Sequence, residues 1–81
     1  MVHCDDDILE WLQFNCAKDR VLYNALTNHS PPPQVVWSRH HHRCWIKLVC
    51  KSGSPLTIGV VMHPVKQEPV HYYRLYESMD K

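Results

Sequence analysis

A short run of imidazole and thiol side chains is the densest group of chemically reactive residues in this sequence. Three consecutive histidines, at positions 40–42, are followed closely by Cys44. Successive side chains of a β-strand point to opposite faces, so on a strand His40, His42 and Cys44 project to one side. Imidazole nitrogen and thiolate sulfur are ligands that Zn²⁺ prefers. The pattern therefore offers, as an alternative to an exposed histidine run, a zinc site whose fourth ligand comes from elsewhere in the chain.

The remaining cysteines do not extend this site. Cys50 lies six residues beyond Cys44, roughly 20 Å along a strand at about 3.3 Å per residue. No two cysteines form a C-x-x-C pair, which excludes a standard zinc finger and a thioredoxin-like motif. The N-terminus has no basic and apolar signal region, so we expect reduced thiols and a nuclear or cytoplasmic location. Our preferred prediction is that the chain binds no cofactor.

A second set of residues points to a negatively charged partner. If residues 39–51 form one continuous strand, the face opposite the cysteines is basic and carries one Trp. Lys and Arg neutralise phosphates and release counterions, and Trp is a platform on which bases stack. The residues predicted to bind nucleic acid, either DNA or RNA, are Arg39, His41, Arg43, Trp45, Lys47 and Lys51.

The formal net charge of +1 conceals a segregation of charge along the chain. Residues 20–67 contain no acid, and their cations are Arg20, Arg39, Arg43, Lys47, Lys51 and Lys66. Residues 1–19 contain Lys18 and the acids Asp5, Asp6, Asp7, Glu10 and Asp19. The middle of the chain therefore presents a positive surface, unless the acidic and basic parts neutralise each other in the fold.

Catalytic signatures are weak. With two glycines the chain cannot build a glycine-rich phosphate loop, and nothing around Cys44 would activate a thiolate nucleophile. The histidine pair at positions 40 and 42 and the tyrosines at 72, 73 and 76 match only formally the groups of a DNA-nicking enzyme. No apolar run approaches the length of about 18 residues that spans a membrane. We expect a chain that is not an enzyme and has no membrane partner.

The elements that must position these residues begin with a helical section over residues 5–28. Three acids at positions 5–7 suit the positive end of a helix, and Ile8, Leu12 and Cys16 follow at helical spacing. Lys18 and Asp19 interrupt this apolar stripe before it resumes at residues 21–26. The pattern fits either one long helix or two helices hinged near Asp19.

After a stiff proline connector at residues 31–33, the sequence predicts β-structure over residues 34–76. The expected strands are 34–38, 39–51, 56–62 and 70–76, with a turn at 52–55. The 81 residues then form a single small α+β domain, in which an N-terminal helix packs on a three- to four-stranded antiparallel sheet. The predicted core residues are Leu12, Leu22, Ile46, Leu48, Ile58 and Val60.

Two short motifs favour the nucleus. Residues 5–12 resemble the acidic, aromatic-containing amphipathic segments of transcription activators, although an ordinary capped core helix has the same pattern. Lys66, between Val65 and Glu68, fits the attachment pattern of a small ubiquitin-like modifier, which requires an exposed loop.

Together these features predict a non-enzymatic nucleic-acid-binding domain of a regulatory protein, acting in transcription. The alternative is a protein–protein interaction or dimerisation module that uses the same sheet or the edge at residues 31–37. Sequence alone does not choose between DNA and RNA, nor does it set the oligomeric state.

Overall fold

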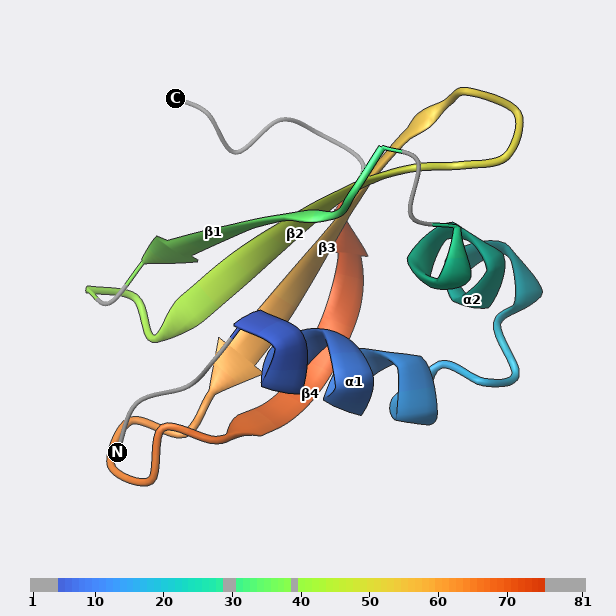
Figure 1. Ribbon diagram of the computed structural model, residues 1–81. Helices are drawn as coiled ribbons and strands as arrows, with labels where there is room; N and C mark the ends of the chain where they lie inside the picture. Colours follow the sequence, from blue (N-terminus) through green and yellow to red (C-terminus); the bar gives the residue numbers. More distant parts are fainter. Residues whose placement is uncertain (1–4, 29–30, 39, 76–81) are drawn as a thin grey trace.

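The helical section is broken into two helices. A computed structural model describes residues 5–28, 31–38 and 40–75 (Figure 1). Helix α1 spans Asp5–Asn15 and α2 spans Arg20–Thr27. Asp19 starts the second helix, because its side-chain oxygen accepts a hydrogen bond from the Leu22 N–H at 3.1 Å. Of the two arrangements that the sequence allowed, the hinged pair is correct.

The rest of the described chain is a four-stranded antiparallel meander with the order β1-β2-β3-β4. Its strands are β1 (Gln34–Ser38), β2 (Arg43–Val49), β3 (Pro55–Met62) and β4 (Pro69–Leu75). Each strand pairs with its neighbour in sequence, so β1 and β4 are the two edges. The α+β arrangement predicted from the sequence is confirmed.

The prediction of one continuous strand over residues 39–51 is wrong. Residues 40–42 form a turn between β1 and β2, and His42 has a φ of 54°, outside the strand region. The carbonyl of His42 accepts a hydrogen bond from Met62 N–H at 2.8 Å, which holds this turn at the end of β3. At its other end β2 stops at Val49, and Lys51 belongs to the turn before β3.

That second turn is the one that the sequence indicated. The Cys50 N–H bonds to the carbonyl of Ser54 and the Gly53 N–H to the carbonyl of Cys50, both at 2.8 Å. Gly53 has a φ of 92°, a conformation that costs glycine little and other residues more. The hairpin therefore has a local cause that is readable in the sequence.

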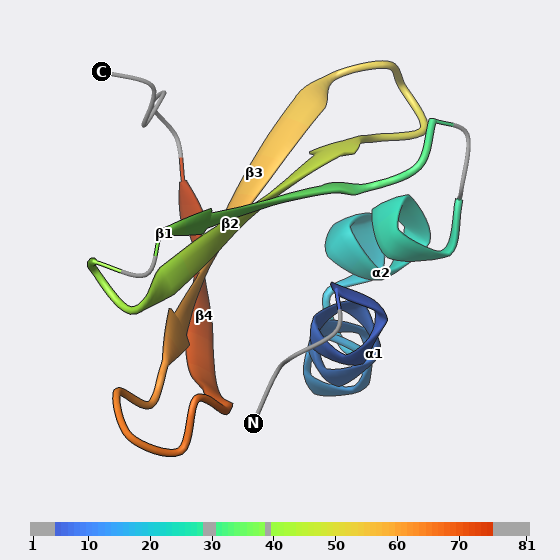
Figure 2. The ribbon, with the colours of Figure 1, turned by 60° about the vertical axis from the view of Figure 1, so that its left-hand side comes forward.

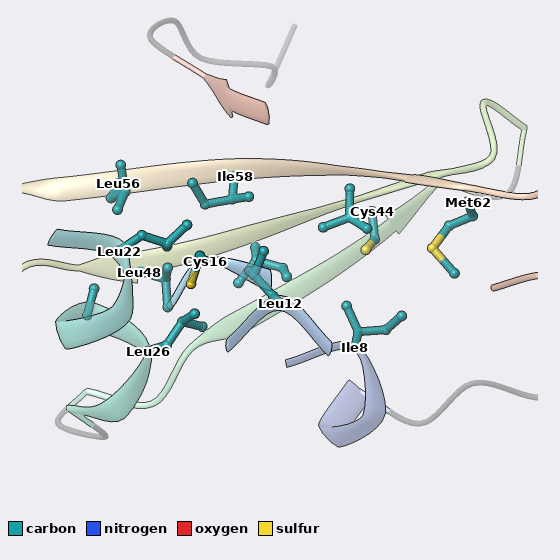
Figure 3. Close-up of a cluster of buried hydrophobic side chains, with 13 residues drawn as sticks. Ile8, Leu12, Cys16, Leu22, Leu26, Cys44, Leu48, Leu56, Ile58 and Met62 are labelled. Carbon is teal, nitrogen blue, oxygen red and sulfur yellow. The ribbon is translucent and has the colours of Figure 1, made fainter. Parts of the chain in front are cut away.

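The core lies between the helices and one face of the sheet (Figures 2 and 3). All six predicted core residues are confirmed, since none exposes more than 4% of its surface. The other buried apolar side chains are Ile8, Cys16, Ala25, Leu26, Cys44, Leu56 and Met62. Within the described residues, no helix is long and apolar enough to cross a membrane.

Helix α1 runs across the sheet from one edge strand to the other. Near its start, Trp37 of β1 donates a hydrogen bond from Nε1 to Oδ1 of Asp5 at 2.9 Å. At its end, the hydroxyl of Tyr72 in β4 donates to the carbonyl of Asn15 at 3.4 Å. The Tyr72 ring also meets Trp11 edge-to-face, with centroids 6.2 Å apart. These contacts fix which face of the sheet the helices cover, and no helix of the described residues lies on the opposite face (Figure 2).

Candidate functional site

The sheet face opposite the helices, which we call the open face, carries the predicted aromatic and basic residues of β2. Burial alternates along this strand, so Cys44, Ile46 and Leu48 are buried while Arg43 is exposed and Trp45 is half-buried. Side chains at alternate positions of a strand share a face. Arg43, Trp45 and Lys47 therefore point away from the helices.

The pairing register adds residues from the other strands. Trp45 lies opposite Val36 of β1 and Gly59 of β3, and Gly59 lies opposite Tyr73 of β4. Directly paired residues of an antiparallel sheet point to the same face. The centre of the open face is thus a row that crosses all four strands, namely Val36, Trp45, Gly59 and Tyr73.

Two further rows flank this aromatic row. The row on one side consists of Ser38, Arg43, Val61 and His71. The row on the other side consists of Gln34, Lys47, Thr57 and Leu75. Arg43 and His71 are exposed, whereas Lys47 is half-buried. Nitrogen-bearing side chains therefore lie on both sides of the aromatic row.

Tyr73 extends over the neighbouring strand. A Cβ atom built on Gly59 would lie 2.5 Å from Cζ of Tyr73 and 2.8 Å from its hydroxyl oxygen, so the ring occupies the space that a side chain at position 59 would need. The ring thus reaches from β4 across β3 in the direction of Trp45 on β2. Glycine at position 59 is what permits this approach.

Trp45 also has an unusual polar atom. Its ring is half-buried, and its Nε1 is shielded from solvent without a hydrogen-bond partner among the described residues. A buried donor that lacks an acceptor costs about 1–3 kcal/mol. Packing alone would be served as well by Phe, which has no such donor.

The two layers of the molecule differ in charge. None of the four strands contains Asp or Glu, whereas the helical layer holds five acids, namely Asp5, Asp6, Asp7, Glu10 and the capping residue Asp19. The charge segregation seen along the sequence therefore becomes a segregation between the helical layer and the sheet. No carboxylate from the described strands opposes the cations of the open face.

Three of the six residues predicted to bind nucleic acid, namely Arg43, Trp45 and Lys47, lie together on the open face. His41 and Lys51 do not join them, because both lie in exposed turns beyond the ends of β2. Nδ1 of His41 is 3.1 Å from the hydroxyl of Ser38. Arg39 lies outside the described residues.

The structure does not assemble the alternative zinc site. His40 and His42 are exposed in the β1–β2 turn, and Cys44 is fully buried in the core. Burial, with a smaller contribution from Asp5, raises the pKa of the Cys44 thiol to about 12, which disfavours the thiolate that a metal requires. Within residues 5–28, 31–38 and 40–75, no group of three His, Cys, Asp or Glu side chains could hold a metal ion. The predicted same-side placement was wrong because β2 begins only at Arg43.

Lys66 lies in the loop that joins β3 to β4. Nδ1 of His63 accepts hydrogen bonds from the backbone N–H groups of Val65, at 3.2 Å, and Lys66, at 3.0 Å. Residues 65–68 are all exposed, and Val65 exposes 83% of its surface. The attachment pattern thus has the exposure that it requires.

Sequence reasoning missed His71 and Tyr73 as members of the site. Their strand was predicted from its aromatic content, and period-two alternation could have put both on one face. Their position beside Arg43 and Trp45 depends in addition on the register in which β4 pairs with β3, which the sequence did not predict.

Comparison with protein-family models, with curated proteins and with solved structures gives no match for this chain. The open face therefore has to be interpreted from its own chemistry.

Proposed function

We propose that this chain is a non-enzymatic nucleic-acid-binding domain that uses the open face. The observation that carries the proposal is that two aromatic rings lie with Arg43 and His71 on the sheet face that no described helix covers. The Arg43 guanidinium attracts phosphates, the His71 imidazole offers them an N–H donor, and aromatic rings stack on bases. The absence of Asp and Glu from the four strands supports the same partner, since a carboxylate there would repel it.

The context that fits this activity is a regulatory protein of the nucleus or cytoplasm, with a role in transcription. The acidic helix α1 and the exposed loop around Lys66 favour the nucleus. The three cysteines in the described residues are free thiols, as expected in a reducing compartment.

A protein–protein interaction or dimerisation module is the second candidate. Its support is β1, which among the described strands pairs with β2 alone. Val36 and Trp37 of β1 expose 38% and 37% of their surface. An exposed edge strand can pair with a strand of another chain. The same open face would then be covered by protein.

A binding assay on generic DNA and RNA at several salt concentrations separates these candidates. Nucleic-acid binding predicts an affinity that falls steeply as the salt concentration rises. Arg43→Ala should make the slope of log affinity against log salt concentration about one unit shallower. Arg20→Ala is the matched control, because Arg20 is an exposed arginine at the start of α2, in the helical layer.

Light scattering after size exclusion completes the experiment. A dimer that forms with increasing concentration and ignores nucleic acid would favour the second candidate and overturn the first. If Arg43→Ala and Arg20→Ala reduce the affinity for nucleic acid equally, binding does not use the open face.

A further inference from the structure

We infer that the nucleic acid recognised by the open face is single-stranded, with unpaired bases stacked on Tyr73 and Trp45. This inference rests on the proposed function, and it adds the form of the ligand. It follows from the width of the sheet and from the position of the two rings.

The sheet is too broad to enter a duplex groove. Four strands spaced by about 4.8 Å place the outer strands roughly 14 Å apart, before side chains are added. The major groove of B-DNA is about 12 Å wide and admits a helix or a two-stranded ribbon. The open face would therefore meet only the outside of an undeformed duplex, which offers phosphates to the cations but no base to the rings.

The rings lie where unpaired bases would reach them. Trp45 lies on β2 and Tyr73 on β4, with β3 between them, so their Cα atoms are roughly 10 Å apart. The Tyr73 ring shortens the distance to Trp45 because it extends over Gly59. Both rings are half-buried, so part of each remains accessible. Bases of a single strand have free π-faces and stack on such rings with little dependence on sequence.

Arg43 and His71 complete the arrangement. They precede Trp45 and Tyr73 by two residues on the same strands, which puts them about 7 Å along the sheet in a neighbouring row. Both are exposed and carry N–H donors. A backbone that follows this row would have its bases over the aromatic row.

The test compares a single-stranded oligothymidylate of about 12 nucleotides with a mixed-sequence duplex of the same length, titrated into the full chain. The single strand should bind at least about tenfold more tightly at 200 mM salt, since stacking is less sensitive to salt than phosphate contacts are. Tyr73→Leu should weaken single-strand binding roughly 5- to 150-fold, whereas Tyr73→Phe should retain it.

Tryptophan fluorescence gives a second readout. Stacking on Trp45 should quench emission when the single strand binds, and Trp45→Phe should remove the quench but keep most of the affinity. Trp11→Phe and Trp37→Phe are matched controls. Trp11 lies on α1 and Trp37 of β1 bonds to α1, so both rings lie on the helical side of the sheet and their loss should leave the quench in place. This readout does not depend on whether Tyr73→Leu folds, which thermal melting would check.

The outcomes distinguish a failure of the stacking inference from a failure of the proposed function. If single strand and duplex bind equally and Tyr73→Leu has no effect, the stacking inference is overturned while nucleic-acid binding stands. If neither ligand binds, both fail. A preference for single strands that disappears in Tyr73→Leu supports both.

Discussion

Arg74 of β4 donates a hydrogen bond from Nη2 to Oδ2 of Asp19, the residue that caps α2. The other carboxylate oxygen accepts from the Leu22 N–H at 3.1 Å. One side chain therefore starts a helix and ties it to an edge strand 55 residues later in the sequence. Because the start of α2 must lie near β4 to make this bond, the bond helps to set the face of the sheet that the helices cover.

The first prediction concerns acid. Burial alone would raise the pKa of the Asp19 carboxyl, but the hydrogen bonds from Leu22 and Arg74 outweigh it and lower this pKa below its ordinary value. Because this pKa is lower in the folded than in the unfolded state, the carboxylate stabilises the fold fully above its unfolded-state pKa of about 3.9. This contribution is lost as the pH falls through the pKa of the folded state. The unfolding free energy, measured by denaturant titration, should therefore decline below about pH 4.

Asp19→Asn should flatten that acid decline and cost about 1 kcal/mol at neutral pH, because Asn still caps the helix but loses its charge toward Arg74. Asp6→Asn is the control, since it removes one exposed carboxylate from the other helix, and it should flatten the decline less than Asp19→Asn does. Identical acid profiles for Asp19→Asn and the parent would contradict this account.

The second prediction concerns the two faces of β2. Leu48 exposes 4% of its surface on the helical side, while Val49 is half-buried on the open face. Leu48→Ala should lower the unfolding free energy by about 2–5 kcal/mol, because it leaves a cavity in the core. Val49→Ala, one residue along the same strand, should cost clearly less. A reversed order in chemical denaturation would mean that the faces are exchanged.

The third prediction concerns Gly59 and Tyr73. Gly59→Ala introduces a Cβ that would overlap the Tyr73 ring, so the ring must swing away. We expect a cost of about 1 kcal/mol, at the low end for overpacking because the phenol end of the side chain can rotate. In a Tyr73→Ala background the same change should cost little, and a double-mutant cycle measures the difference. Equal costs in both backgrounds would argue against the overlap.

The fourth prediction concerns thiol reactivity. Cys44 is fully buried and its thiol has a pKa of about 12, and burial also raises the pKa of the Cys16 thiol. Cys50 is only half-buried. Alkylation of the folded protein near pH 8, followed by peptide mapping, should modify Cys50 well before Cys16 or Cys44, because the thiolate is the reactive form. Rapid labelling of Cys44 without unfolding would contradict its position in the core.

Much of the fold was predictable because its causes are local. The acids at positions 5–7, the apolar spacing from Ile8 to Cys16 and the interruption at Asp19 act within a few residues of the chain. The hairpin turn follows in the same way from the conformational freedom of Gly53. The six core residues were also identifiable, since helical and strand periodicities put their side chains on the buried faces.

The candidate site was predictable only in part, because only some of its causes are local. Alternation along β2 was sufficient to put Arg43, Trp45 and Lys47 on one face. It was not sufficient to end the strand, because three histidines carry no turn signal and His42 leaves the strand conformation where it bonds to Met62 of β3.

Only the tertiary structure decided which side chains lie beside Trp45 on the open face. Tyr73 comes within reach of it through two strand pairings and through a glycine at the one position where a Cβ would block the ring. Pairing register is a property of contacts between distant segments, which the packing of helices on the opposite face helps to set. The amino-acid sequence by itself therefore determined the elements, the core and the charges, while the register of the folded sheet decided which of those charges and rings share a surface.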